Sequence, residues 1–216
     1  MVKSQITDVN LNSTNLYKFV TDINSQSNFS RRIVIVDSTV NNYQKLVKGI
    51  IVPANLFVLD DKQDGVLQLV QILHQYNTIQ EIHLVCHGLP GCLKLGSTQL
   101  SLDTLPYYCN SLQSLAPKLS NASIMLYGCQ VATGEKGNTF IDQLQQLTGA
   151  NNISASTTAT GSQTLGGDWN LQVNIGHSIP NVRSIFSEAT METYNHILAF
   201  ESDDFNETSL DSFWSF

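Results

Sequence analysis

Charged side chains are scarce, since Asp, Glu, Lys and Arg together make up only 13% of the 216 residues. The 11 Lys and Arg residues form no cluster and the net charge is −7, so nucleic acid and anionic membranes are poor partners. The longest apolar run, GIIVPANLFVL, is interrupted by Pro53 and Asn55 and is too short to span a bilayer. No membrane insertion is therefore expected.

Several recognisable motifs are also missing. The opening MVKSQITDVN has no apolar stretch typical of a signal peptide, which favours the cytoplasm or export by a route that reads no N-terminal signal. The four cysteines show neither zinc-binding spacing nor a dense disulfide pattern. The chain has no GxSxG, P-loop or GxGxxG motif. A metal site built from His83, His87 and a cysteine is disfavoured, because Cys86 should point to the opposite face of its strand. We expect no metal and no cofactor.

What the sequence does contain is an alternation of strands and helices. Hydrophobic residues make up 42% of the chain, as in globular proteins. The alternation predicts an α/β fold, with a mostly parallel sheet and helices on both faces. Strands are expected over 31–38, 54–60, 81–86, 123–127 and 151–156, and a turn leading into a β segment over 164–176. Helices are expected over 13–23, 41–50, 64–76, 103–119 (interrupted near Pro106), 137–149 and 187–198.

Two of these strands end in an unusual way. HLVCHGLPG (83–91) places His87 and Gly88 directly after a strand, and IMLYGCQVA (124–132) places Cys129 after Gly128. The carboxyl ends of parallel strands meet at one sheet edge, where ligands bind in such folds. If the two strands are neighbours, roughly 4.8 Å apart, the histidine and the cysteine face each other.

A facing histidine and cysteine can perform nucleophilic acyl transfer. The thiolate attacks a carbonyl carbon, and the imidazole protonates the leaving amine. The backbone N–H groups of Gly88 and Cys129 could form an oxyanion hole. The alternative is structural, because His87 could be a turn residue and Cys129 a buried core thiol.

The motifs together also resemble a known superfamily. CHG and YGC at the ends of consecutive strands are similar to the caspase-like cysteine peptidases. HLVCHGLPGCLKLG, IMLYGCQVATGEKGNTFIDQLQQLTGA, ISASTTATG and LGGDWNL most resemble an uncharacterised bacterial family of caspase-like domains. Its members stand at the front of large, often cyanobacterial, surface or secreted proteins. The resemblance covers about residues 30–180 and implies a caspase-like three-layer sandwich.

The resemblance also assigns roles to residues. It implies His87 as general acid, Cys129 as nucleophile and Gly88 as an oxyanion donor. It implies that the first strand of the sheet lies beside the third, so that Asp37 could orient His87. The alternative for Asp37 is an N-cap of the helix that follows.

A substrate pocket is expected from Thr157, Thr158 and Asp168. The family pattern has an acid where this chain has Thr158, and the alternative roles are a turn cap for Asp168 and core packing for Trp169. Because the segment carries an acid and no base, we expect cleavage after Lys or Arg.

The expected organisation has three parts. Residues 1–29 are expected to form a polar arm with a short helix, and 30–198 the caspase-like domain. Residues 199–216 are expected to be a linker and the start of a following domain, which resembles a lectin-like or glucanase-like β-sandwich. The predicted function is a cysteine endopeptidase whose substrate is a peptide or protein, including its own parent chain.

Two other functions remain open. One is a catalytically inactive caspase-like interaction module of a multidomain surface protein, and the other is a flavodoxin-like domain that binds a small ligand. If the domain is an enzyme, Cys129 should alkylate faster than Cys86, Cys92 and Cys109.

Overall fold

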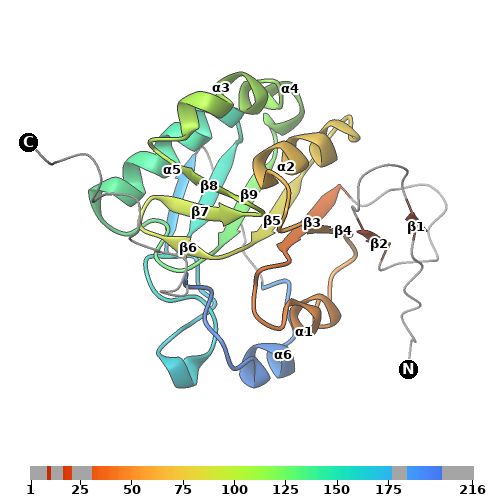
Figure 1. Ribbon diagram of the computed structural model, residues 1–216, viewed down its shortest axis with the longest axis vertical. Helices are drawn as coiled ribbons and strands as arrows, with labels where there is room; N and C mark the ends of the chain where they lie inside the picture. The colour runs from red at the N-terminus through yellow and green to blue at the C-terminus, as the bar shows by residue number, and fades with distance from the viewer. Residues whose placement is uncertain (1–8, 11–16, 21–30, 177–183, 201–216) are drawn as a thin grey trace, which may run out of the picture.

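The structure of the protein is a computed structural model that describes residues 9–10, 17–20, 31–176 and 184–200. Strands and helices alternate along the chain from residue 31 onward (Figure 1). The mixed α/β fold expected from the sequence is confirmed. The segment 201–216, where the start of a following domain was expected, lies outside the described residues.

The main sheet is mostly parallel at its centre. It has the order β1-β2-β4-β3-β5-β9-β10-β11, in which β4, β3, β5, β9 and β10 run parallel. The strands β2 and β11 pair antiparallel with β4 and β10. The bounds are β1 Val9–Asn10, β2 Tyr17–Val20, β3 Arg32–Asp37, β4 Asn55–Leu59, β5 Glu81–Val85, β9 Ser123–Tyr127, β10 Asn152–Ala155 and β11 Val173–Gly176. The first predicted strand, β3, lies beside the third, β5, as expected.

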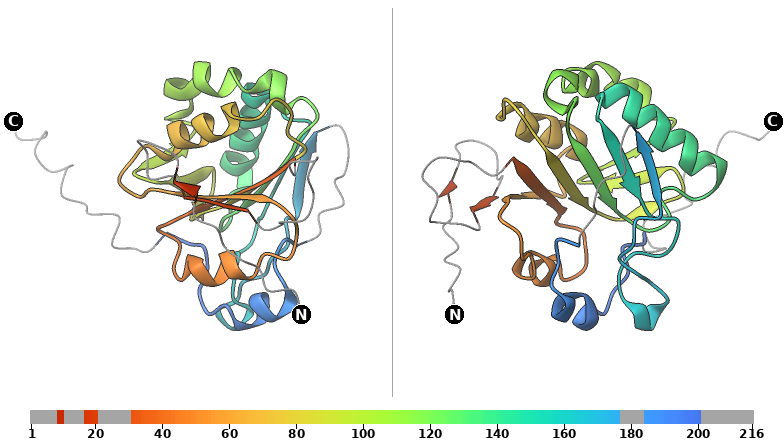
Figure 2. Two further views of the ribbon diagram at one scale, coloured as in Figure 1. Left: turned by 90° about the vertical axis from the view of Figure 1, so that its right-hand side faces the viewer. Right: turned by 180° about the vertical axis from the view of Figure 1, so that it is seen from behind.

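Helices cover both faces of this sheet, which gives three layers (Figures 1 and 2). Four helices lie on one face and two on the other. The first group is α2 Gly65–His74, α3 Leu105–Gln113, α4 Ala116–Leu119 and α5 Gly134–Thr148. The second group is α1 Tyr43–Lys48 and α6 Glu188–Thr193. A 3-10 turn, η1, spans Gln163–Leu165.

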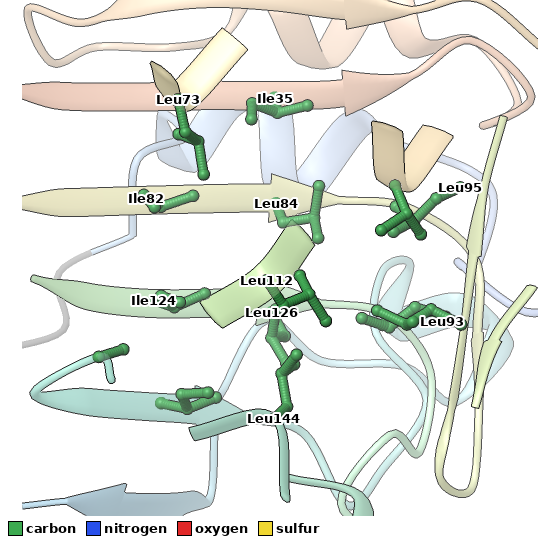
Figure 3. Packing of buried hydrophobic residues seen from close by; sticks show 14 of the residues in the cluster. Ile35, Leu73, Ile82, Leu84, Leu93, Leu95, Leu112, Ile124, Leu126 and Leu144 are labelled. Atoms are coloured by element: carbon green, nitrogen blue, oxygen red, sulfur yellow. The ribbon is translucent and has the colours of Figure 1, made fainter. Parts of the chain in front are cut away.

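The alternation of side chains along each strand divides the core in two. On β5, Ile82 and Leu84 face α2, α3 and α5, whereas Val85 belongs to the cluster on the other face. Figure 3 shows Leu73 of α2 and Leu112 of α3 next to the side chains of β5, and Leu144 of α5 beside Leu126 of β9. Both faces of the central strands are therefore buried, as is typical of parallel sheets.

A second, smaller sheet follows β5 and was not predicted. It is antiparallel and has the order β6-β7-β8, with bounds Gly88–Leu89, Cys92–Leu95 and Thr98–Ser101. Its turns contain Gly91 and Gly96, whose φ angles are +69° and +55°. Left-handed backbone favours glycine, so closely spaced glycines between short apolar runs were the missed signal.

Three predicted helices differ from the structure. Within 13–23 the described residues Tyr17–Val20 form strand β2, which pairs with β4. Pro106 lies in the first turn of α3 and begins that helix, where a missing N–H costs nothing, and the interruption falls at 114–115. The closing helix expected over 187–198 ends at Thr193, because Tyr194 turns to an extended conformation with ψ 125°.

Candidate functional site

The predicted site residues gather at the carboxyl edge of the central strands. Asp37 ends β3, His87 follows β5, and Cys129 follows β9. Pairs of residues in register, such as Val85 and Tyr127, show that β5 and β9 are direct neighbours. The strand order reverses between β3 and β5, and ligands of open α/β sheets bind at such a point.

The imidazole of His87 is held by a backbone carbonyl. Its Nε2 lies 3.1 Å from the oxygen of Thr39, and because a carbonyl only accepts, Nε2 must donate. In the neutral ring Nδ1 is then left with a lone pair. This nitrogen is buried and has no hydrogen-bond partner within the part of the chain that the structure describes. Nδ1 is therefore the ring nitrogen that is left available for a further hydrogen bond.

Asp37 does not orient His87 directly, and it is not a helix cap either. Its Oδ1 accepts hydrogen bonds from the backbone N–H and hydroxyl of Thr39, and its Oδ2 accepts one from the N–H of Gly96. The N-cap position of α1 belongs to Asn42. The carboxylate thus fixes the loop whose carbonyl holds His87. The N-cap alternative is wrong, and any orientation of His87 by Asp37 acts through Thr39, which lies between the carboxylate and the imidazole.

Two backbone N–H groups converge on one oxygen beside Cys129. The N–H of Gly88 and the N–H of Cys129 both donate to the carbonyl oxygen of Leu198, at 3.0 and 3.1 Å. A Cβ on Gly88 would lie 2.9 Å from the backbone nitrogen of Cys129, so only glycine permits this approach. Paired N–H donors on one carbonyl oxygen are the geometry of an oxyanion hole.

The sulfur of Cys129 is buried next to the backbone of Thr160. It lies 3.2 Å from the nitrogen and 3.6 Å from the oxygen of that residue. Burial raises the pKa of the Cys129 thiol above its ordinary value, against a smaller lowering by backbone hydrogen bonds. The expectation that this thiol would be the fastest to alkylate therefore disagrees with the structure, in which its side chain is covered.

The cover is an extended segment near the end of the described chain. Leu198 donates its N–H to the oxygen of Thr160 at 2.8 Å, and Ser162 donates to the oxygen of His196 at 2.9 Å. Gly161 and Ile197 form an antiparallel bridge. This extended segment was not predicted from the sequence, because residues 187–198 were expected to be helical.

The segment continues past Cys129 toward His87. Ala199 forms a parallel bridge with Gly88, and the ring of Phe200 lies 6.4 Å from that of His87, centroid to centroid. An extended stretch of the chain's own backbone, residues 196–200, therefore crosses both candidate catalytic residues. We call it the strap.

The three candidate pocket residues lie in one loop that flanks the site. Thr158 donates its hydroxyl to Asp168 at 2.7 Å, and the Asp168 carboxylate also accepts the N–H of Asn170 at 2.6 Å. The hydroxyl of Thr133 donates a hydrogen bond to the carbonyl oxygen of Thr157. The carboxylate of Asp168 thus lies beside Thr158, the position where the resemblance noted from the sequence led us to expect an acid. It also has the turn-capping role considered as its alternative.

A cavity of about 530 Å³ opens next to this loop. Three carboxylates line it, from Asp168, Glu188 and Glu192, and Tyr127 and Trp169 are among its other residues. Trp169 packs edge-on against Phe186, with centroids 5.0 Å apart, which is the core role considered for it. A basic or amine-bearing group is the chemistry that such an acidic cavity would accept.

The described residues contain no group of three or more His, Cys, Asp or Glu side chains placed to hold a metal ion. None of their helices combines the length and the apolar character needed to cross a membrane.

The comparison with known families covers nearly the whole described domain. Residues 33–198 match the family described as "Domain of unknown function (DUF4347)". The chain belongs to this family. No curated protein matches it. The matched region of this DUF4347 domain begins in β3 and reaches Leu198, so it contains every candidate residue described above.

Proposed function

We propose that this DUF4347 domain is a caspase-like cysteine endopeptidase with a His87 and Cys129 dyad. The observation that carries the proposal is the convergence of the Gly88 and Cys129 N–H groups on a single carbonyl oxygen. Such convergence is what an acyl-transfer site needs at the carbonyl it attacks, and the cysteine that supplies one N–H also supplies the thiol. The fold alone would not support this, since many functions share it.

The proposed chemistry gives each of these groups a role. Nδ1 of His87, which is free of partners among the described residues, takes the thiol proton as Cys129 attacks the carbonyl carbon. The two N–H groups stabilise the negative charge on the carbonyl oxygen. His87 then protonates the departing amine, and water hydrolyses the thioester. Thr39 and Asp37 hold the imidazole in place for both proton transfers.

The proposed substrate is a peptide or protein in extended conformation. The backbone of Thr160 and Ser162 pairs with an extended segment as an edge strand would, and this mode recognises main chain irrespective of most side chains. The acidic cavity favours a basic side chain in the substrate, although the sequence prediction placed this side chain directly before the cleaved bond.

The second candidate function is an inactive interaction module. The observation that favours it is the strap itself, because a site filled by its own chain and a thiol with raised pKa suit a domain without turnover.

A mechanism-based thiol probe on a short peptide separates the two candidates. The enzyme should label at Cys129 in wild type, at a much lower level in His87→Ala, and not in Cys129→Ala. Cys92→Ala, which removes another buried thiol, is the matched control and should label like wild type. Both site variants should stay folded by circular dichroism, because the residues lie at strand ends. Labelling of Cys129 that is independent of His87 would contradict the dyad.

A further inference from the structure

We infer that the strap is the domain's own substrate and that the bond cleaved is Leu198–Ala199. This inference rests on the proposed function and names its target. The carbonyl oxygen of Leu198 occupies the oxyanion position, so the bond that follows this carbonyl is the one presented to Cys129. A carbonyl carbon lies about 1.2 Å from its oxygen, which keeps it beside the same cysteine.

Hydrogen bonds to Thr160 and Cys129 hold the backbone N–H and carbonyl groups of Leu198. Its N–H and the sulfur of Cys129 both approach the carbonyl oxygen of Thr160, at 2.8 and 3.6 Å. Its carbonyl oxygen accepts from the backbone of Cys129 itself. The hydrogen bonds of the Leu198 N–H to Thr160 and of the Leu198 carbonyl oxygen to Cys129 thus place this peptide group next to the cysteine.

The groups after the bond lie toward His87. Ala199, whose nitrogen would leave as an amine, pairs with Gly88, and Phe200 packs against the His87 ring. A general acid must stand on the leaving-group side of the carbonyl. The direction of the strap across the site therefore agrees with the proposed roles of the two catalytic residues.

Gly161, which pairs with the strap, indicates that the loop is shaped to bind an extended chain. Gly161 has φ +128°, and a Cβ there would lie 2.5 Å from the oxygen of His196. Only glycine lets the two backbones approach closely enough to pair. The loop is therefore shaped to accept an extended chain in the register that brings Leu198 to Cys129.

The side chain of Leu198 defines the pocket before the cleaved bond. It is fully buried in the apolar cluster that includes Tyr127, Phe186 and Tyr194. An apolar side chain therefore fits this position, in place of the Lys or Arg predicted from the sequence. The acidic cavity borders the same cluster through Tyr127 and Trp169, and we assign it to another part of a substrate.

The reaction balances as an ordinary hydrolysis. The Cys129 sulfur bonds to the Leu198 carbonyl carbon, its proton passes to His87, and the C–N bond to Ala199 breaks as His87 returns that proton to the amine. One water then splits the thioester, leaving a carboxylate at Leu198 and the free thiol. The region shared with the family extends to Leu198, so the cut would separate that region from whatever follows it.

The experiment follows the mass of the purified 216-residue chain over time, with sequencing of new amino termini. Wild type should yield fragments 1–198 and 199–216, and Cys129→Ala should keep its full mass. Leu198→Lys should be cut about 100-fold more slowly, because a charged side chain would have to enter the buried apolar pocket. The control Leu165→Lys, at a leucine that is 55% exposed, should be cut like wild type.

The outcomes separate this inference from the proposed function. Cutting at another bond overturns self-cleavage at Leu198 and leaves the proposed peptidase activity intact. The same conclusion follows if the wild-type chain stays uncut while Cys129 of the Leu198→Lys chain reacts with the peptide probe. A Cys129 that reacts in neither chain, with no cleavage, overturns both. If the Leu198→Lys chain misfolds, the experiment uses Leu198→Met in its place. This chain should be cut at nearly the wild-type rate.

Discussion

The carbonyl of Thr39 accepts a hydrogen bond from Nε2 of His87 at 3.1 Å, and this contact orients the imidazole. The loop that carries Thr39 is held in turn by Asp37, whose carboxylate also binds the N–H of Gly96 in the turn between β7 and β8. Asp37 is therefore a positioning residue that couples the unpredicted small sheet to His87.

Replacing this carboxylate should slow catalysis without removing the dyad. Asp37→Asn keeps the size but cannot accept at both ends, so the Thr39 loop should loosen. We expect self-cleavage to slow by roughly 10- to 100-fold, as for small displacements of catalytic groups. The pH profile of the cleavage rate should also shift, because His87 loses its fixed tautomer.

Asp60→Asn is the matched control for this variant. Asp60 follows the neighbouring strand β4 and accepts hydrogen bonds from its own turn, at Lys62 and Gln63, without contacting Thr39. It should leave the rate and its pH profile unchanged. An Asp37→Asn chain with wild-type kinetics would show that the Thr39 loop keeps its position without the Asp37 carboxylate.

The thiol of Cys129 should be protected while the strap is bound. In the uncut His87→Ala chain, Cys129 should be alkylated more slowly than the half-buried Cys109. The reason is that the Cys129 thiol is buried and its pKa is raised. Adding Leu198→Lys to that chain should accelerate alkylation at Cys129 and leave the rate at Cys109 unchanged. Mass mapping of alkylated peptides measures both rates, and equal rates at Cys129 in the two chains would mean that the strap does not cover the sulfur.

Peptides varied before the cleaved bond should show a preference for leucine. We expect leucine ahead of lysine and arginine, with aspartate cleaved least, because the buried cluster around Leu198 is apolar. A fluorogenic library with the Leu198→Lys chain measures this order. A preference for basic residues that Asp168→Ala abolishes would support the prediction made from the sequence and reject the leucine pocket.

Glu81, at the opposite end of β5, should make stability depend on acid pH. Hydrogen bonds from His83 and then Arg32 lower the pKa of Glu81 from 4.5 to about 2. A depressed pKa adds stability above the unfolded value, and this stability is lost as the pH falls from about 4.5 toward 2. Glu81→Gln should therefore be less stable than wild type at pH 7, and the difference should shrink across that window.

Urea unfolding at several pH values measures this difference. Glu135→Gln, at an exposed position in the first turn of α5, is the control and should leave the pH dependence of wild type almost unchanged. A difference in unfolding free energy between wild type and Glu81→Gln that stays constant from pH 7 to pH 2 would contradict the lowered pKa of Glu81.

The parts of the site that depend on parallel strands were predictable from sequence. His87 and Cys129 follow strands with clear apolar patterns, and neighbouring parallel strands bring their carboxyl ends to one edge whatever the loops do. The strap was not predictable in this way. Leu198 pairs with a loop near Thr160, far away in sequence, and no local periodicity encodes such pairing. The role of Asp37 was missed for the same reason, because it depends on the turn at Gly96.

The hydrogen bond from the hydroxyl of Tyr194 to the carbonyl of Asn41 joins the end of the domain to its first crossover, 153 residues earlier. During synthesis the chain emerges from its amino end, so the central strands are complete well before the strap. The nascent domain therefore passes through an interval in which Cys129 has emerged but its cover has not. Self-cleavage at Leu198 would therefore wait until residues 196–200 had also emerged and paired with the loop at Thr160.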